Sequence, residues 1–183
     1  GGKYGIAFSS GMASADSCMK LLSQGDHVVC CDDVYGGTAR LFNNLMTNYG
    51  VEFTYVDSQN AENVENAIRP ETKMIWIETP TNPLLKVTDL DAVGKIAKRN
   101  DLLYVVDTTF ATPVFLKPLE YGADLVLHST TKYLSGHNQI IGGAIITDRA
   151  DLYDQLKYIQ KSVGAVPSPF DCWMVIMGLK TLH

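Results

Sequence analysis

The chain has 183 residues, of which 46% are hydrophobic and 19% charged, as is usual for one globular domain with its own core. Its net charge of −5 and the lack of any Lys/Arg-rich run argue against nucleic acid as a partner. No apolar run is long enough to span a bilayer, and the four cysteines form no CxxC pair, so we expect a cytoplasmic protein with reduced thiols.

Short apolar runs alternate along the chain with longer amphipathic stretches. The apolar runs predict seven strands: Tyr4 to Ser9, His27 to Cys31, Glu52 to Val56, Lys73 to Glu78, Leu102 to Asp107, Asp124 to Ser129 and Gly142 to Thr147. The amphipathic stretches predict six helices: Met12 to Ser23, Thr38 to Asn48, Glu62 to Ile68, Asp89 to Arg99, Arg149 to Ser162 and Ser168 to Gly178. We expect Asp89 to cap the N-terminus of the fourth helix.

The order of these elements predicts an α/β fold with a doubly wound, mainly parallel sheet. Several strands are apolar on both faces, Met74 to Ile77 among them, which indicates a sheet covered by helices on both sides. The last strand follows its predecessor after the short, glycine-containing link Leu134 to Ile141. Because that link is too short for a parallel crossover helix, we expect the seventh strand to run antiparallel.

Ligands of open α/β sheets bind beyond the carboxyl ends of the strands. The segments that follow the first two predicted strands carry residues suited to ligand binding. Ser9 to Met12 is made of small residues that leave backbone N–H groups free to hold an anion where a helix begins. A simple strand-to-helix turn is the alternative. Asp32 to Thr38 places two glycines beside Tyr35, which could stack on a flat ring or be an exposed residue of a turn.

The fourth and fifth strands also end in polar residues. Glu78 to Pro83 contains two prolines and displays a carboxylate and an amide, either as a functional loop or as a structural bend. Asp107 follows four apolar residues, where an unpaired carboxylate is costly. It needs a partner such as a protonated ring nitrogen, unless it caps a turn.

The sixth strand ends in three hydroxyl residues followed by Lys132 and a glycine turn. Hydroxyl groups can hold a phosphate, and an amine can form a Schiff base with a carbonyl ligand. Taken alone, a lysine is more often a solvated surface charge. Because these five strand ends face the same crevice, they together predict one site.

These residues resemble the Cys/Met-metabolism family of pyridoxal-phosphate-dependent enzymes, the trans-sulfuration enzymes. The family's motifs appear in order as Ser-Ser-Gly-Met-Ala, Asp-Val-Tyr-Gly-Gly-Thr, Glu-Thr-Pro-Thr-Asn-Pro and Val-Val-Asp-Thr-Thr-Phe. The segment Asp124 to Asn138 is similar to the family's lysine signature over its whole length, and the resemblance runs from Tyr4 to the end. Within the family, Asp32 to Thr38 and Gly164 to Pro169 most resemble the cystathionine γ-lyases.

The resemblance implies the large domain of the fold type I pyridoxal-phosphate transferases over residues 1–183. We expect this chain to be the middle of a longer polypeptide, without the N-terminal arm and C-terminal domain of the family. Family members share active sites between subunits, so the resemblance also implies a homotetramer built from dimers.

The resemblance also implies roles for individual residues. Lys132 would hold pyridoxal 5′-phosphate covalently and move protons, Asp107 would pair with the ring nitrogen, and Tyr35 would stack on the ring. The other implied contacts are the phosphate ligands Gly11, Met12, Ser129 and Thr131, the ring supports Glu78 and Thr109, and the substrate-carboxylate ligands Asn82 and Arg40.

The implied activity is γ-elimination of cystathionine to cysteine, 2-oxobutanoate and ammonia. The same cofactor residues serve cystathionine γ-synthase, cystathionine β-lyase and methionine γ-lyase, and a truncated cofactor-binding scaffold would also keep them. Gly37 stands where methionine γ-lyases commonly have a cysteine, which disfavours methionine as the main substrate. A nicotinamide dehydrogenase is disfavoured because Ser9 to Ala13 lacks G-x-G-x-x-G, and the four histidines show no metal-binding spacing.

Overall fold

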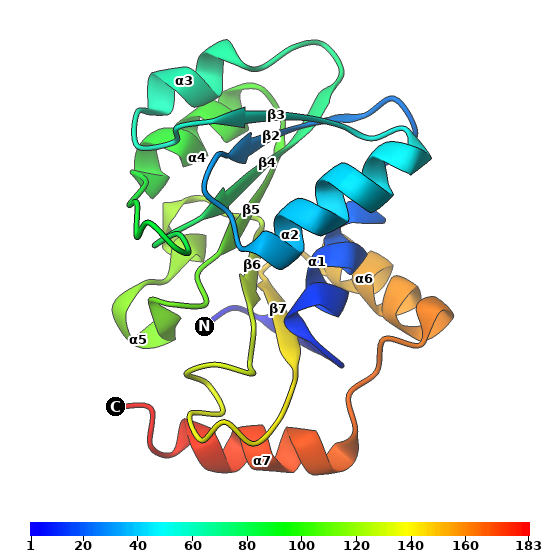
Figure 1. Ribbon diagram of the computed structural model, residues 1–183, viewed down its shortest axis with the longest axis vertical. Helices are drawn as coiled ribbons and strands as arrows, with labels where there is room; N and C mark the ends of the chain where they lie inside the picture. Colours follow the sequence, from blue (N-terminus) through cyan, green and yellow to red (C-terminus); the bar gives the residue numbers. More distant parts are fainter.

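A seven-stranded sheet runs through the centre of the protein, with the strand order β1-β7-β6-β5-β4-β2-β3 (Figure 1). The computed structural model describes residues 1–183. The strands are β1 (Tyr4–Phe8), β2 (His27–Cys31), β3 (Glu52–Val56), β4 (Thr72–Glu78), β5 (Leu103–Asp107), β6 (Leu125–His128) and β7 (Gly143–Thr147). All seven predicted strands are present, with ends that differ from the prediction by no more than one residue.

Only β7 runs against the direction of the other strands. It pairs antiparallel with both β1 and β6, whereas β2, β3, β4, β5 and β6 pair parallel with one another. The chain between β6 and β7 contains no helix, so β7 turns back beside β6 without a crossover. The predicted α/β fold, with its antiparallel seventh strand, is confirmed.

Helices cover both faces of the sheet. Figure 1 shows α1, α2 and α6 on one side and α3, α4 and α5 on the other, while α7 lies apart, below the end of the sheet. Their bounds are α1 (Gly11–Met19), α2 (Gly36–Arg40), α3 (Ala61–Asn66), α4 (Leu90–Arg99), α5 (Thr112–Phe115), α6 (Ala150–Val163) and α7 (Pro169–Leu179). None of them combines the length and the hydropathy that crossing a bilayer requires.

The helix predictions differ from the structure mainly at their ends. The first helix stops at Met19, four residues before the predicted end, and the second begins at Gly36 and continues as a π-helix (Leu41–Leu45) and a 3-10 turn (Met46–Tyr49). Gly50, at φ +78°, ends this second helix. The short α5 and the 3-10 turn Pro118–Tyr121 were not predicted, because four residues show no periodicity.

The core lies on both faces of the central strands. Every residue of β2 is buried, and so is β4 from Met74 to Glu78. Trp76, Tyr104 and Phe42 are fully buried, and burying each such side chain contributes roughly 1.5–3 kcal/mol. This packing holds β2, β4, β5 and β6 side by side, and their carboxyl ends therefore meet at one edge.

Candidate active site

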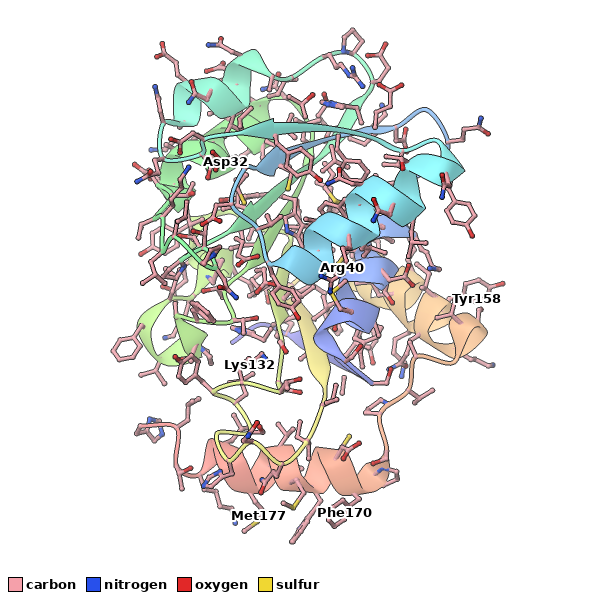
Figure 2. The ribbon with its side chains drawn as sticks, viewed as in Figure 1. Asp32, Arg40, Lys132, Tyr158, Phe170 and Met177 are labelled. Atoms are coloured by element: carbon pink, nitrogen blue, oxygen red, sulfur yellow. The ribbon has the colours of Figure 1, made fainter.

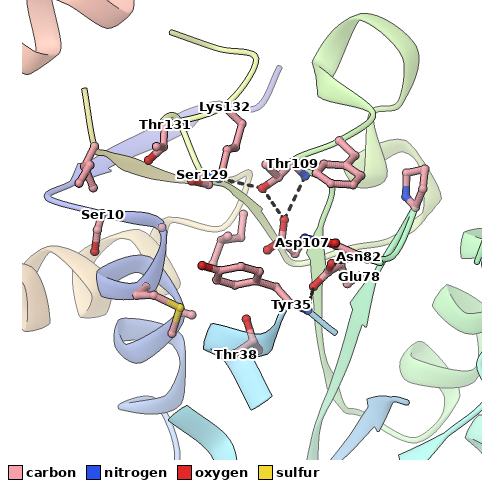
Figure 3. A pocket seen from close by; sticks show the side chains of 17 residues that line it. Ser10, Tyr35, Thr38, Glu78, Asn82, Asp107, Thr109, Ser129, Thr131 and Lys132 are labelled. Atoms are coloured by element: carbon pink, nitrogen blue, oxygen red, sulfur yellow. Dashed lines mark hydrogen bonds between the residues drawn. The ribbon is translucent and has the colours of Figure 1, made fainter. Parts of the chain in front are cut away.

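A cavity of about 420 Å³ opens at this edge of the sheet (Figure 3). It is lined by 17 residues, among them every predicted site residue except one. The exception is Arg40, on the last turn of α2 (Figure 2), whose exposed side chain is not among those that line the cavity. Its predicted contact with a substrate carboxylate has no support from this geometry.

Lys132 follows the end of β6 in a tight turn. Its backbone N–H donates to the Ser129 carbonyl at 3.3 Å, and the Gly136 N–H donates to the Lys132 carbonyl at 2.9 Å. The side chain lines the cavity and forms no ion pair with any carboxylate of the protein. An amine that is free of a salt bridge in this position can react with a carbonyl ligand.

Asp107 ends β5 and is buried beside the cavity. Its Oδ1 accepts two hydrogen bonds from Thr109, one from the backbone N–H at 3.0 Å and one from the hydroxyl at 2.6 Å. The Ser129 N–H in turn donates to the Thr109 hydroxyl at 2.8 Å (Figure 3). No hydrogen bond reaches Oδ2, which leaves that oxygen for a partner from the cavity.

No cationic side chain stands beside Asp107. Burial therefore raises the pKa of this carboxyl group, and the two bonds from Thr109 only partly oppose the rise. A buried carboxylate of this kind is stabilised by a cation that enters the cavity. A protonated ring nitrogen would meet this need, as predicted from the position of Asp107 in the sequence.

Glu78 ends β4 and joins two loops of the cavity wall. One carboxylate oxygen accepts the Tyr35 N–H at 2.8 Å, and the other accepts the Asn82 N–H at 3.0 Å. Burial and the nearby Asp107 raise the pKa of Glu78, while these two N–H groups oppose the rise. Glu78 thus fixes the backbone of Tyr35 and Asn82, a role that its position in the sequence did not reveal.

Tyr35 precedes α2 and displays its ring in the cavity (Figure 3). Its side chain is 43% exposed, so one side of the ring is open to a ligand. A Cβ atom on Gly37 would lie 2.4 Å from Cε1 of Tyr35 and 2.8 Å from Sδ of Met12. The lack of a side chain at Gly37 is therefore what allows the ring to occupy this position.

The opposite side of the cavity offers donors for an anion. The Ser10 hydroxyl caps α1 by accepting the Ala13 N–H at 2.9 Å, which leaves the N–H groups of Gly11 and Met12 without an intrahelical acceptor. A Cβ atom on Gly11 would lie 2.9 Å from Cβ of Ser129, so glycine brings the helix start against that hydroxyl. These donors match the predicted phosphate site.

Thr131 contributes to this side differently from the prediction. Its hydroxyl donates to the Gly142 carbonyl at 3.2 Å and accepts the Gly142 N–H at 3.0 Å. Although Thr131 lines the cavity, its hydroxyl already has two backbone partners.

Sequence reasoning missed part of the cavity wall. Ser10 and Phe110 stand inside motifs that the sequence analysis singled out, and a serine directly before a helix is itself an N-cap signal. The apolar members showed no comparable signal, because a helix or loop position does not reveal which residues a ligand would touch. The additional lining residues are Ser10, Ala15, Thr38, Pro80, Phe110, Leu127 and Ile141.

The donors and acceptors of the cavity fit pyridoxal 5′-phosphate. Asp107 offers an unpartnered acceptor for a protonated ring nitrogen, and Tyr35 offers a ring face. Gly11, Met12 and Ser129 offer donors for a phosphate, and Lys132 offers an amine for the aldehyde.

Comparisons with known proteins agree with this fit. The model of the family described as Cys/Met metabolism PLP-dependent enzyme matches residues 1–183. The chain is 52% identical to cystathionine γ-lyase of Bacillus subtilis, over 99% of the chain and 48% of that protein. It is 49% identical to a probable cystathionine γ-synthase of Herpetosiphon aurantiacus, over 98% of the chain and 56% of that protein.

A solved structure shows the same fold. Cystathionine γ-lyase from Lactobacillus plantarum, complexed with L-serine, superposes with a TM-score of 0.97 at 45% identity. This match covers 99% of the chain and 48% of that structure. The chain thus spans about half the length of the curated relatives it matches.

Proposed function

This chain belongs to the family of Cys/Met metabolism PLP-dependent enzymes, and from that premise we propose that the whole protein is a carbon–sulfur lyase. It would cleave cystathionine by γ-elimination to cysteine, 2-oxobutanoate and ammonia. The alternatives within the family are γ-synthase, β-lyase and methionine γ-lyase activity, and a scaffold that binds the cofactor without turnover. The proposal concerns the whole protein, because the chain spans only about half of its relatives.

One observation carries the proposal: the free amine of Lys132 and the unpartnered oxygen of Asp107 face the same cavity. When bound there, pyridoxal phosphate supplies an electron sink for the negative charge that develops at the α-carbon of an amino acid. Asp107 would keep the ring nitrogen protonated, because burial raises the pKa of this carboxyl group and a cation beside it would stabilise its charged form. Tyr35 would stack on the ring.

The residues of the chain then perform the proton transfers. Lys132 Nζ would hold the cofactor covalently and, once freed, would remove the α-proton of the substrate. Removal of a second proton at the β-carbon allows the sulfur on the γ-carbon to leave, and this sulfur takes up a proton to become the thiol of cysteine. Addition of water releases 2-oxobutanoate and ammonia.

Two features support γ-elimination of cystathionine over its alternatives. The segments Asp32 to Thr38 and Gly164 to Pro169 most resemble cystathionine γ-lyases, and a relative with that name is 52% identical. Methionine γ-lyases commonly have a cysteine in place of Gly37, and a side chain there would collide with the Tyr35 ring in this structure. A relative named as a probable γ-synthase has nearly the same identity, so an assay must decide between these reactions.

The decisive experiment assays the full-length protein with cystathionine, homocysteine, methionine and an activated homoserine plus cysteine. Cysteine and 2-oxobutanoate from cystathionine would support the proposal. Homocysteine and pyruvate would indicate a β-lyase, and cystathionine formed from activated homoserine a synthase. Cofactor binding without any product would indicate a scaffold. In every active case, Lys132→Ala should abolish both the visible absorption of the bound cofactor and turnover.

We also propose that the protein acts in the cytoplasm as a homotetramer of dimers. Support for the location comes from the cysteines, all four of which are free and three of which are buried. Support for assembly comes from α7, whose large apolar side chains are exposed in the isolated chain.

A further inference from the structure

Asp33 connects two loops of the cavity wall but lines no part of the cavity itself. It lies two residues before Tyr35, just beyond the end of β2. Its Oδ2 accepts the hydroxyl of Thr81 and, at 2.9 Å, the N–H of Leu84. Both partners belong to the loop that follows β4 and carries Asn82 into the cavity.

Thr81 is the fully buried centre of this loop. Its N–H donates to the Lys86 carbonyl at 3.1 Å, and its carbonyl accepts the Leu85 N–H at 3.1 Å. Its hydroxyl donates to Asp33 and accepts the Lys86 N–H at 2.8 Å. All polar groups of Thr81 therefore have partners, and Asp33 is the only one that lies outside the loop.

Apolar packing contributes little to holding the loop in place. Leu84, Leu85 and Val87 are all exposed, so none of these large apolar side chains anchors the loop in the core. Its shape therefore depends on polar contacts. Lys86 also forms ion pairs with Asp32 at 2.8 Å and with Asp57 at 3.5 Å, which are partly exposed and worth little by comparison. Near the end of the loop, the hydroxyls of Thr88 and Ser58 share a hydrogen bond at 2.7 Å.

We propose that Asp33 is a positioning residue: by holding Thr81 and Leu84, it fixes Asn82 in the cavity opposite Tyr35 and so sets how tightly the substrate carboxylate binds. This inference rests on the proposed function, because it assigns Asn82 to the substrate. Glu78 holds the Asn82 N–H from the strand below, and Asp33 holds the residues on either side of Asn82 from the neighbouring loop. Without Asp33, residues 81–84 keep only the Glu78 hydrogen bond to a residue outside the loop.

The test uses the full-length protein with bound cofactor and four variants. Asp33→Ala removes both acceptor contacts, whereas Asp33→Asn keeps one acceptor oxygen of the same shape. Thr81→Val removes the hydroxyl donor with little change in volume, and the double variant Asp33→Ala/Thr81→Val tests whether the two residues act through one bond. Asp26→Asn is the matched control, because Asp26 also accepts a loop N–H, that of Ser23 at 2.7 Å, but at the opposite end of β2.

We expect Asp33→Ala and Thr81→Val each to raise KM for the substrate about tenfold, because each variant loses a hydrogen bond to a charged group. The value of kcat should change much less. The double variant should be no worse than either single variant. Asp33→Asn should recover part of the affinity, and Asp26→Asn should leave KM unchanged. The visible absorption of the bound cofactor should be the same in all variants.

Two substrate-independent measurements separate this inference from the proposed function. The first is the Kd of L-serine, read from the change in cofactor absorption, and the second is hydrogen exchange of residues 79–87. Both should change in Asp33→Ala and Thr81→Val even if the wild-type protein turns over none of the assayed substrates, in which case only the proposed function fails. Unchanged exchange, additive effects in the double variant, or a loss in kcat with KM and Kd unaltered would each refute the role of Asp33.

Discussion

Asp107 and Glu78 are the two cavity residues whose pKa the fold raises. Both carboxyl groups are buried at the ends of adjacent strands, and burial raises the pKa of each, with the charge of Asp107 adding to the rise at Glu78. A group whose pKa is raised by folding stabilises the protein below its unfolded pKa, and this contribution is lost as the pH rises through the folded pKa. The cofactor-free protein should therefore lose stability from this pair as the pH rises toward neutrality.

Replacing Asp107 tests the predicted pH dependence of stability at a single residue. In the cofactor-free protein, Asp107→Asn should gain stability relative to wild type as the pH rises from about 5 to about 8, because the variant no longer carries the buried charge. The measurement is the urea midpoint of both proteins across this range. Burial lowers the pKa of His128 to about 4 and also lowers that of His27, but both histidines are present in each protein and cancel in the difference.

With the cofactor bound, wild type should be more stable than Asp107→Asn. Wild type gains an ion pair with the ring nitrogen, whereas Asp107→Asn cannot form one, and removal of one partner of a buried charge pair costs about 2–5 kcal/mol. We expect kcat/KM of Asp107→Asn to fall by at least about 30-fold. A stability difference that did not depend on pH would contradict the assignment of Asp107 as a buried carboxyl group with a raised pKa.

At the scale of elements, the strands could be predicted closely and the loops between them could not. β2 and β3 have the predicted ends, because an apolar run bounded by polar residues shows directly in the sequence. The contacts of Glu78 with Tyr35 and of Asp33 with Thr81 join residues 43 and 48 positions apart. Such contacts depend on β2 and β4 lying side by side, which neither loop specifies by itself.

The start of α2 offers a matched pair of substitutions. A Cβ atom at Gly37 would lie 2.4 Å from the Tyr35 ring, whereas one at Gly36 would meet only the Arg40 side chain at 3.7 Å. Gly37→Ala should therefore displace Tyr35 and weaken cofactor binding about tenfold, because the ring loses its stacking contact. Gly36→Ala should bind the cofactor as tightly as wild type. Fluorescence or absorbance titration of the cofactor-free proteins measures both Kd values, and equal values would show that the ring does not depend on Gly37.

At the scale of the whole molecule, the site exists only because distant segments meet at one edge of the sheet. Each strand end read alone was consistent with a turn, a cap or a surface charge. Their common direction followed from the parallel order of the sheet, which alternating strands and helices predict well. Arg40 shows the limit of this reasoning, since it follows Tyr35 closely in the sequence and yet does not line the cavity.

The surface of α7 is the remaining feature that the isolated chain leaves without a partner. Asp171 is the only charged residue of the helix, only Gly178 is buried, and Trp173 and Ile176 are exposed, as is Phe170 (Figure 2). A helix of this composition is normally buried, and aromatic side chains on such a surface are typical of the centres of protein interfaces. We therefore expect α7 to lie in an interface of the proposed tetramer.

Substitution on two helices distinguishes an interface from ordinary surface hydrophobicity. Phe170→Ser/Trp173→Ser in the full-length protein should shift the molar mass in light scattering toward smaller species, with the dissociation concentration raised at least about 30-fold. Tyr158→Ser on α6 is the control, because Tyr158 is 74% exposed, compared with 64% for Phe170, but lies on a helix with a polar outer face. If both variants kept the wild-type mass, α7 would not be an assembly surface, and its apolar side chains would have to be covered within one subunit.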